Sequence, residues 1–228
     1  SLPAGCGPHD VAIALVGKLF KSGYVKNKVM EFVGPGIASL RQDTRNAIDA
    51  MTTETTCWSS IWQTDGVTEE YLAGHGRADA YKELKPADVA YYDGCIELDL
   101  SKIECMIALP MHPSYAYPIR ELKANAKDLL HEIETRANEQ LSGKVKMNLV
   151  SKVRADGSIY VDQGIVAGCS GGTYENLCAV ADILRGKSCG NGEFKFSAYP
   201  DSMPTYLELV KNGVVADIVS CLLYTSPS

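Results

Sequence analysis

Cys169 lies in a run of small residues between two apolar segments. The segment 161–167 before it is typical of a buried strand, and the stretch from Tyr174 has helical spacing. A thiolate that binds a bulky metal-containing group needs small neighbours and free backbone amides. The residues around the cysteine offer both: Gly168, Ser170, Gly171 and Gly172. A Gly-rich turn with an incidental cysteine stays the alternative, because a tripeptide such as Gly-Cys-Ser recurs by chance.

This run resembles the first iron–sulfur ligand loop of the aconitase and isopropylmalate dehydratase family. The family loop is a strand, then G-S-C-T-N, then a helix that opens with Tyr/Ile-Glu-Asp. The resemblance covers nearly all of residues 5–219 and is closest to a bacterial aconitase-type hydratase. It implies that Cys169 is one of three cysteine ligands of a 4Fe-4S cluster. The other two form a C-x-x-C pair in the family, which this chain lacks, and Gly171 stands where the family has Asn.

A second match concerns Glu54. The segment from Met51 to Glu54, which continues to 59–62, resembles the family segment M-G-A-E followed by I-G-A-T-T-S and an apolar-aromatic pair. In aconitases this glutamate lies close to the cluster and the substrate hydroxyl, so the resemblance implies that Glu54 exchanges a proton there. A polar residue in a Thr-rich turn is the alternative. Ala50 stands where the family has Asn, a departure from the aconitase pattern.

The resemblance implies a hydro-lyase that dehydrates and rehydrates a hydroxy di- or tricarboxylic acid. In the family, the iron without a protein ligand binds the substrate as a Lewis acid, and a serine of a distant domain abstracts the proton. That domain, the substrate-binding arginines and the C-x-x-C pair are outside this sequence. We therefore expect an internal fragment that is inactive alone and needs the missing N- and C-terminal parts of the same protein.

An alternative function is that of an aconitase-related, iron-responsive RNA-binding protein, and the net charge of the chain tests it. Such a protein needs a basic groove. The chain has 22 basic and 28 acidic residues, a net charge of −6 and a pI near 5.3, so nucleic acid is not the expected partner. A third interpretation is an α/β domain that holds no cluster at all.

Cysteine usage and hydropathy indicate the compartment. Most of the eight cysteines sit inside apolar patterns, as Cys105 and Cys178 do, which favours buried free thiols. No apolar run approaches the ~18 residues of a membrane span. We also expect no signal peptide at the start of the sequence. We therefore expect a cytoplasmic protein without a membrane partner.

Periodicity predicts the elements that must position these residues. Strands are expected at 29–33, 94–100 and before Cys169. Helices are expected at about 10–21 with Asp10 as its cap, 42–51, 120–141, from the cysteine loop to Gly186, and 205–212. Three prolines within 109–118 exclude regular helix and predict an extended crossover between domains. We expect His112 in this segment to be a solvated or packing histidine and not a catalytic one.

Alternating strands and helices predict an α/β fold of two three-layer αβα units with mostly parallel, aconitase-like sheets. We expect the units at 1–108, incomplete at its N-terminus, and 109–219, which carries the cysteine loop. Residues 220–228 break the pattern, and we expect a non-native tail there. Because ligands bind at the carboxyl ends of parallel strands, we expect Cys169 and Glu54 to face one crevice.

Overall fold

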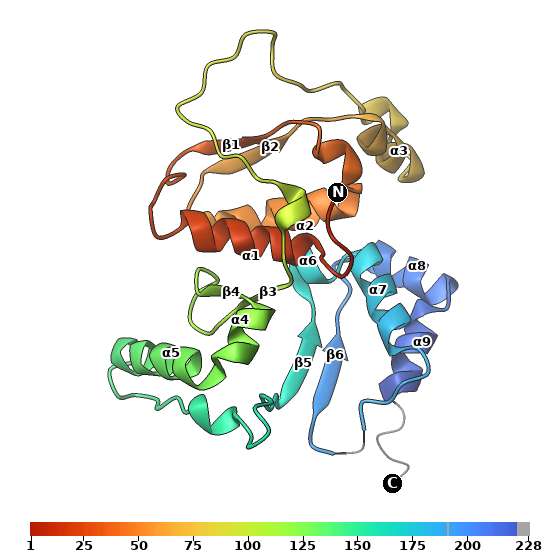
Figure 1. The fold of residues 1–228 in the computed structure, drawn as a ribbon. Helices are drawn as coiled ribbons and strands as arrows, with labels where there is room; N and C mark the ends of the chain where they lie inside the picture. Colours follow the sequence, from red (N-terminus) through yellow and green to blue (C-terminus); the bar gives the residue numbers. More distant parts are fainter. Residues whose placement is uncertain (191, 223–228) are drawn as a thin grey trace. The chain divides into compact units, whose positions relative to one another are not determined.

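The computed structural model describes residues 1–190 and 192–222 (Figure 1). Helices and strands alternate along the chain, and two of the three two-stranded sheets in this part are parallel, so the α/β class is confirmed. The chain divides into two compact units, one that ends at Asn125 and one that begins at Ala126. We expected the boundary at 108/109. Residues 109–125 belong to the first unit because they return as a strand that pairs with 106–108.

The first unit contains a parallel pair of short strands, β1 (Val29–Phe32) and β2 (Ser59–Trp62). The strands pair so that Phe32 lies opposite Trp62, and the two rings stack with their centroids 4.2 Å apart. Figure 1 shows α1 (Pro8–Leu19) and α2 (Gln42–Thr52) on the same side of this sheet. The strand predicted at 29–33 and the helix predicted at 42–51 are thereby confirmed.

Helix α1 begins earlier than its sequence pattern indicated. Pro8 takes the first position, where a missing amide costs no helical hydrogen bond. Asp10 accepts the Gly7 amide at 2.7 Å, so it caps the helix from within the first turn and does not precede it. The inner face of α1 joins β1 and α2 in one core. Its buried members are Val11, Leu15, Leu19, Val25, Met30, Leu40, Ile48 and Ile103.

A long exposed segment follows α3 (Gly66–Gly74). The strand predicted at 94–100 is wrong: residues 87–99 are all exposed, and a 3₁₀ turn begins at Leu100. An alternating pattern becomes a strand only where a neighbour pairs with its backbone groups, and no strand among the described residues does so. The Tyr24 hydroxyl donates to the Cys95 carbonyl at 3.5 Å and tethers the segment to the unit.

Residues 109–118 contain no helix, as the prolines predicted. They turn back so that β4 (Ala116–Pro118) pairs antiparallel with β3 (Met106–Ala108), and the Leu109 amide donates to the Tyr115 carbonyl at 2.8 Å. His112 packs its ring against Phe20, with centroids 3.9 Å apart, so of the two expected roles, solvated or packing, the structure shows the packing one.

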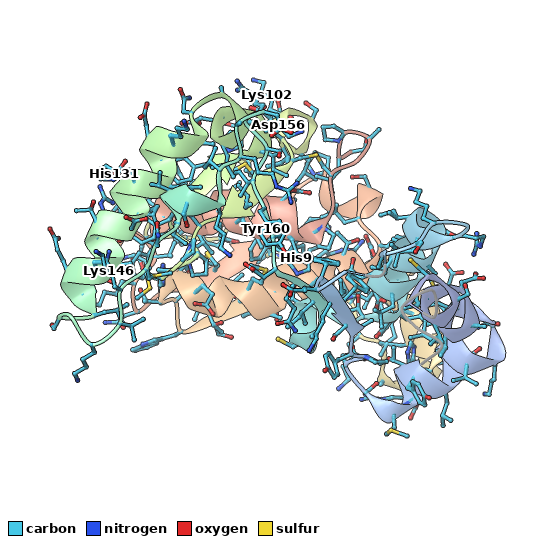
Figure 2. The ribbon with its side chains drawn as sticks, turned by 90° about the horizontal axis from the view of Figure 1, so that it is seen from below. His9, Lys102, His131, Lys146, Asp156 and Tyr160 are labelled. Atoms are coloured by element: carbon cyan, nitrogen blue, oxygen red, sulfur yellow. The ribbon has the colours of Figure 1, made fainter. Side chains whose placement is uncertain are left out.

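The helix predicted at 120–141 is two helices. Helix α4 (Ile119–Ala124) ends at Asn125, whose backbone leaves the helical region, and α5 (Ala126–Gln140) starts the second unit. The buried face of α5 consists of Ala126, Leu130, Ile133 and Ala137. Figure 2 shows His131 on the outer side of α5 and Lys146 on the loop that follows it.

The second unit also has a parallel strand pair, β5 (Gln163–Val166) and β6 (Lys195–Ala198), in register. Three helices lie on one side of it in Figure 1: α7 (Tyr174–Leu184), α8 (Met203–Lys211) and α9 (Val214–Leu222). Their shared core consists of Leu177, Ala181, Leu209, Val214 and Ile218. Helix α8 matches the helix predicted at 205–212.

Helix α9 crosses the start of the predicted non-native tail. It runs to Leu222, and Cys221 is buried with its sulfur 3.5 Å from that of Cys189. Residues 220–222 therefore continue the fold, and the rest of the predicted tail, 223–228, lies outside the described residues. No helix in the described part of the chain is both long and apolar enough to cross a bilayer.

Arg45 of α2 is the most buried charged residue of the first unit, with 1% of its surface exposed. Its guanidinium donates to the backbone carbonyls of Ile37 and Leu40, at 3.0 and 3.1 Å, and pairs with both carboxylate oxygens of Asp65 at 2.7 and 2.9 Å. Asp65 also caps α3 by accepting the amides of Val67 and Thr68. The Arg45 side chain therefore joins α2, the turn before α2 and the start of α3.

The hydrogen bond from Arg45 lowers the pKa of Asp65. The stability that the Arg45–Asp65 pair contributes is therefore complete above the ordinary aspartate pKa and is lost as the pH falls through the lowered pKa. We expect Asp65→Asn, which keeps the helix cap, to lower the free energy of unfolding at pH 7 by roughly 2–3 kcal/mol, because it leaves a buried guanidinium without its counter-charge. Urea denaturation at pH 7 and pH 3 measures this, and the deficit should shrink at pH 3.

The matched control for this substitution is Glu83→Gln, which removes an exposed ion pair with Lys85. Exposed pairs contribute little, so no measurable change is expected. An equal deficit of the Asp65 variant at both pH values would contradict the role of the charge.

Candidate functional site

Cys169 follows strand β5 directly and opens a single helical turn. Ala167 is still extended, Gly168 has a φ of +85°, and the turn α6 (Gly168–Gly171) contains the cysteine as its second residue. A φ in this range disfavours any residue with a Cβ. The predicted order of strand, cysteine loop and helix is confirmed, but the main helix α7 starts only at Tyr174.

The end of this turn packs tightly against the chain that follows β6. A Cβ at Gly172 would lie 2.5 Å from the Tyr199 carbonyl oxygen and 2.8 Å from the Asp201 amide nitrogen. The Asp201 amide donates to the Gly172 carbonyl at 2.9 Å, and the Tyr199 amide donates to the Val166 carbonyl at 2.8 Å. Glycine is therefore the residue that fits this contact, which fixes the loop at the carboxyl end of the sheet.

Cys169 differs in exposure from the residues that follow it. Residues 170–173 are buried, and the Asn176 side chain holds the Ser170 carbonyl at 2.9 Å, whereas Cys169 is exposed. The thiol thus stands on a rigid turn and is open to a ligand. No group of three His, Cys, Asp or Glu residues within the described ranges could by itself hold a metal ion.

Other cysteines lack this combination. Burial and the neighbouring Cys105 thiol raise the pKa of Cys6 to about 11, and burial and the Cys221 thiol raise the pKa of Cys189. A raised pKa keeps a thiol protonated, and metal binding needs the thiolate. Cys178 lies within α7, away from any strand end.

Glu54 occupies the middle of a 3₁₀ turn, Thr53–Thr55, that joins α2 to the loop before β2. Its side chain is exposed, and no hydrogen bond or ion pair from the described residues holds its carboxylate. Thr55 beside it is fully buried. Thr56 then adopts a left-handed conformation with φ 66°, which ends the turn. Glu54 is thus an exposed carboxylate on an anchored turn.

Threonine hydroxyls anchor this turn to its own backbone. The hydroxyls of Thr52, Thr53 and Thr55 donate to the carbonyls three residues earlier, at 2.7, 3.1 and 2.6 Å. These hydrogen bonds hold residues 52–55 in a tight turn. Sequence reasoning missed Asp49, which accepts hydrogen bonds from Ser60 and Trp62 of β2. The spacing of Ser60 and Trp62 places both on one face of a strand, but no sequence signal joins that face to Asp49, which lies on the other side of the turn.

Glu54 belongs to the first unit and Cys169 to the second. Each is exposed on a short turn next to a parallel strand pair. The expectation that both line one crevice stays a prediction.

An α/β chain with an exposed cysteine on a turn at a strand end is suited to present a thiolate to a cofactor. Sequence comparison identifies the class: a model of the aconitase family (aconitate hydratase) matches residues 1–221. The chain belongs to the aconitase family.

Individual relatives are distant but cover most of the chain. The 3-isopropylmalate dehydratase large subunit of Clostridium beijerinckii is 26% identical over 210 residues, which are 92% of this chain and 41% of the relative. The 2,3-dimethylmalate dehydratase large subunit of Eubacterium barkeri has the same identity and coverage. The 3-isopropylmalate dehydratase large subunit of Clostridioides difficile is 24% identical over 213 residues. The chain thus spans about two fifths of these relatives, whose names give no support to the RNA-binding alternative.

The close approach at Gly172 makes a testable prediction. Gly172→Ala should lower the free energy of unfolding by about 1–3 kcal/mol, because its Cβ meets backbone atoms that cannot rotate away. Gly192→Ala, in the same unit and with no atom near its added Cβ, is the control and should have little effect. Chemical denaturation measures both variants, and equal stabilities would show that the turn relaxes freely.

Proposed function

We propose that the full-length protein is a 4Fe-4S-dependent hydro-lyase that dehydrates and rehydrates a hydroxy di- or tricarboxylic acid. Membership of the aconitase family supports the reaction class, and the names of the relatives, dehydratases of substituted malates, support the substrate class. The single observation that carries the proposal is the exposed Cys169 on the rigid turn after β5.

The residues around Cys169 fit one corner of a cluster. The thiol is exposed, and its flanking residues are glycine and serine, so a bulky inorganic group has room beside it. We assign one ligand position to Cys169, and the remaining cysteine ligands lie outside this chain. When bound, the cluster supplies a Lewis-acidic iron for the substrate hydroxyl and carboxylate.

The proposed role of Glu54 is to hold and move a proton at the substrate hydroxyl. A carboxylate without an internal partner is free to exchange a proton with a bound water or hydroxyl. The turn around it limits the directions in which its side chain can point. The chain alone should be inactive, since its site is completed by other parts of the same protein. A cytoplasmic location belongs to the same proposal.

Cys169→Ser in the full-length protein should abolish the visible absorbance of the cluster together with the activity. A serine oxygen is a poor replacement for a thiolate on iron. Absorbance spectra and iron content after reconstitution measure the loss without recourse to turnover. Cys178→Ser and Cys189→Ser are the controls and should keep the cluster. If Cys189→Ser lost it while Cys169→Ser kept it, the ligand assignment would be wrong.

Glu54→Gln should behave differently. Its cluster absorbance should match that of the wild-type protein, while kcat falls by roughly a hundred- to ten-thousand-fold, the usual contribution of a general acid–base group. Steady-state kinetics with a hydroxy-dicarboxylate substrate measures the effect. Retention of wild-type kcat would remove Glu54 from the mechanism.

A further inference from the structure

Asp49 connects α2 to β2 near the Glu54 turn. Its Oδ1 accepts hydrogen bonds from the Ser60 hydroxyl and, at 3.0 Å, from the Trp62 indole nitrogen. Asp49 is half-buried in α2, and its two donors lie on the same face of β2. One carboxylate oxygen therefore ties the helix before the turn to the strand after it.

The connection continues from Asp49 into the turn through Thr52. The Thr52 hydroxyl donates to the Asp49 carbonyl at 2.7 Å and lies 3.1 Å from the Ser60 hydroxyl. The Thr52 carbonyl in turn accepts the Thr55 hydroxyl at 2.6 Å and the Cys57 thiol at 3.3 Å. An unbroken series of contacts thus runs from Asp49 to Thr55, the direct neighbour of Glu54.

We propose that Asp49 is a positioning residue that fixes the direction of the Glu54 side chain; this inference rests on the proposed function for the role of Glu54. No hydrogen bond from the described residues holds the Glu54 carboxylate, so its direction follows from the backbone of its turn. The two ends of that turn are α2 and the loop into β2, and Asp49 holds them together.

The geometry also says which property of Asp49 matters. Both side-chain hydrogen bonds end on Oδ1, so a neutral acceptor at that atom is sufficient. Asp49→Asn keeps such an acceptor, whereas Asp49→Ala removes it. A carboxylate that itself moved a proton would lose its function in both variants, and a positioning residue loses it in the alanine variant alone.

Hydrogen exchange tests the positioning without reference to catalysis. The Thr56 amide donates to the Thr53 carbonyl at 3.0 Å and closes the turn. In full-length Asp49→Ala, we expect the peptide that contains Thr56 to exchange about ten times faster than in the wild-type protein, and Asp49→Asn to exchange at the wild-type rate. A peptide that contains Gly172, in the second unit, is the internal control and should not change. Unchanged exchange at Thr56 in Asp49→Ala would overturn the inference.

Kinetics tests the consequence for Glu54. Asp49→Ala should keep the cluster absorbance and KM but lower kcat by roughly ten- to a hundred-fold, the effect expected of a misdirected catalytic group, and Asp49→Asn should restore kcat. Asp79→Asn, an exposed aspartate outside the network, is the control with unchanged kcat. If Glu54→Gln loses turnover while Asp49→Ala keeps it, the positioning role is wrong. If the wild-type protein has no hydro-lyase activity, the proposed function fails, and hydrogen exchange alone decides whether Asp49 holds the turn.

Discussion

The buried ion pair between Arg45 and Asp65 closes the segment that carries Glu54. Arg45 lies in α2, before the turn that carries Glu54, and Asp65 follows β2, after it. Helix, turn and strand between them therefore form a loop whose two ends are joined by a guanidinium with almost no exposure. Within that loop, the hydrogen bonds of Asp49 join α2 to β2 across a shorter stretch of the chain. The direction of one exposed carboxylate thus depends on charges and hydrogen bonds placed on both sides of it in the sequence.

Both candidate residues stand on anchored turns, but different residue types anchor the two turns. Cys169 stands on a turn fixed by glycine, because the Gly172 backbone approaches residues 199–201 too closely for a side chain. Glu54 stands on a turn fixed by threonine hydroxyls that donate to the backbone. In both, the residue that follows the exposed candidate side chain is buried. Rigid placement of an accessible group is what a cluster ligand and a proton-transfer group each require.

Local signals in the sequence predicted local structure well. The strand at 29–33 and the helix at 42–51 were correct because hydrophobic spacing and terminating residues act within a few positions. The strand expected at 94–100 failed because pairing needs a neighbour, which no periodicity reveals. Cys169 and Glu54 were identified from their resemblance to a family, whereas Asp49 was missed. Its partners lie across a turn, and a contact of that kind belongs to the tertiary fold.

The exposed segment at residues 87–99 has a consequence for the integrity of the first unit. The core is assembled from residues on both sides of the segment, since Ile103 packs with α1 and β1. A protease that cuts within the segment would therefore sever the chain without removing a core side chain, and the two pieces would stay associated through that core. After such a cut, the packed core and not the intact chain would hold the first unit together.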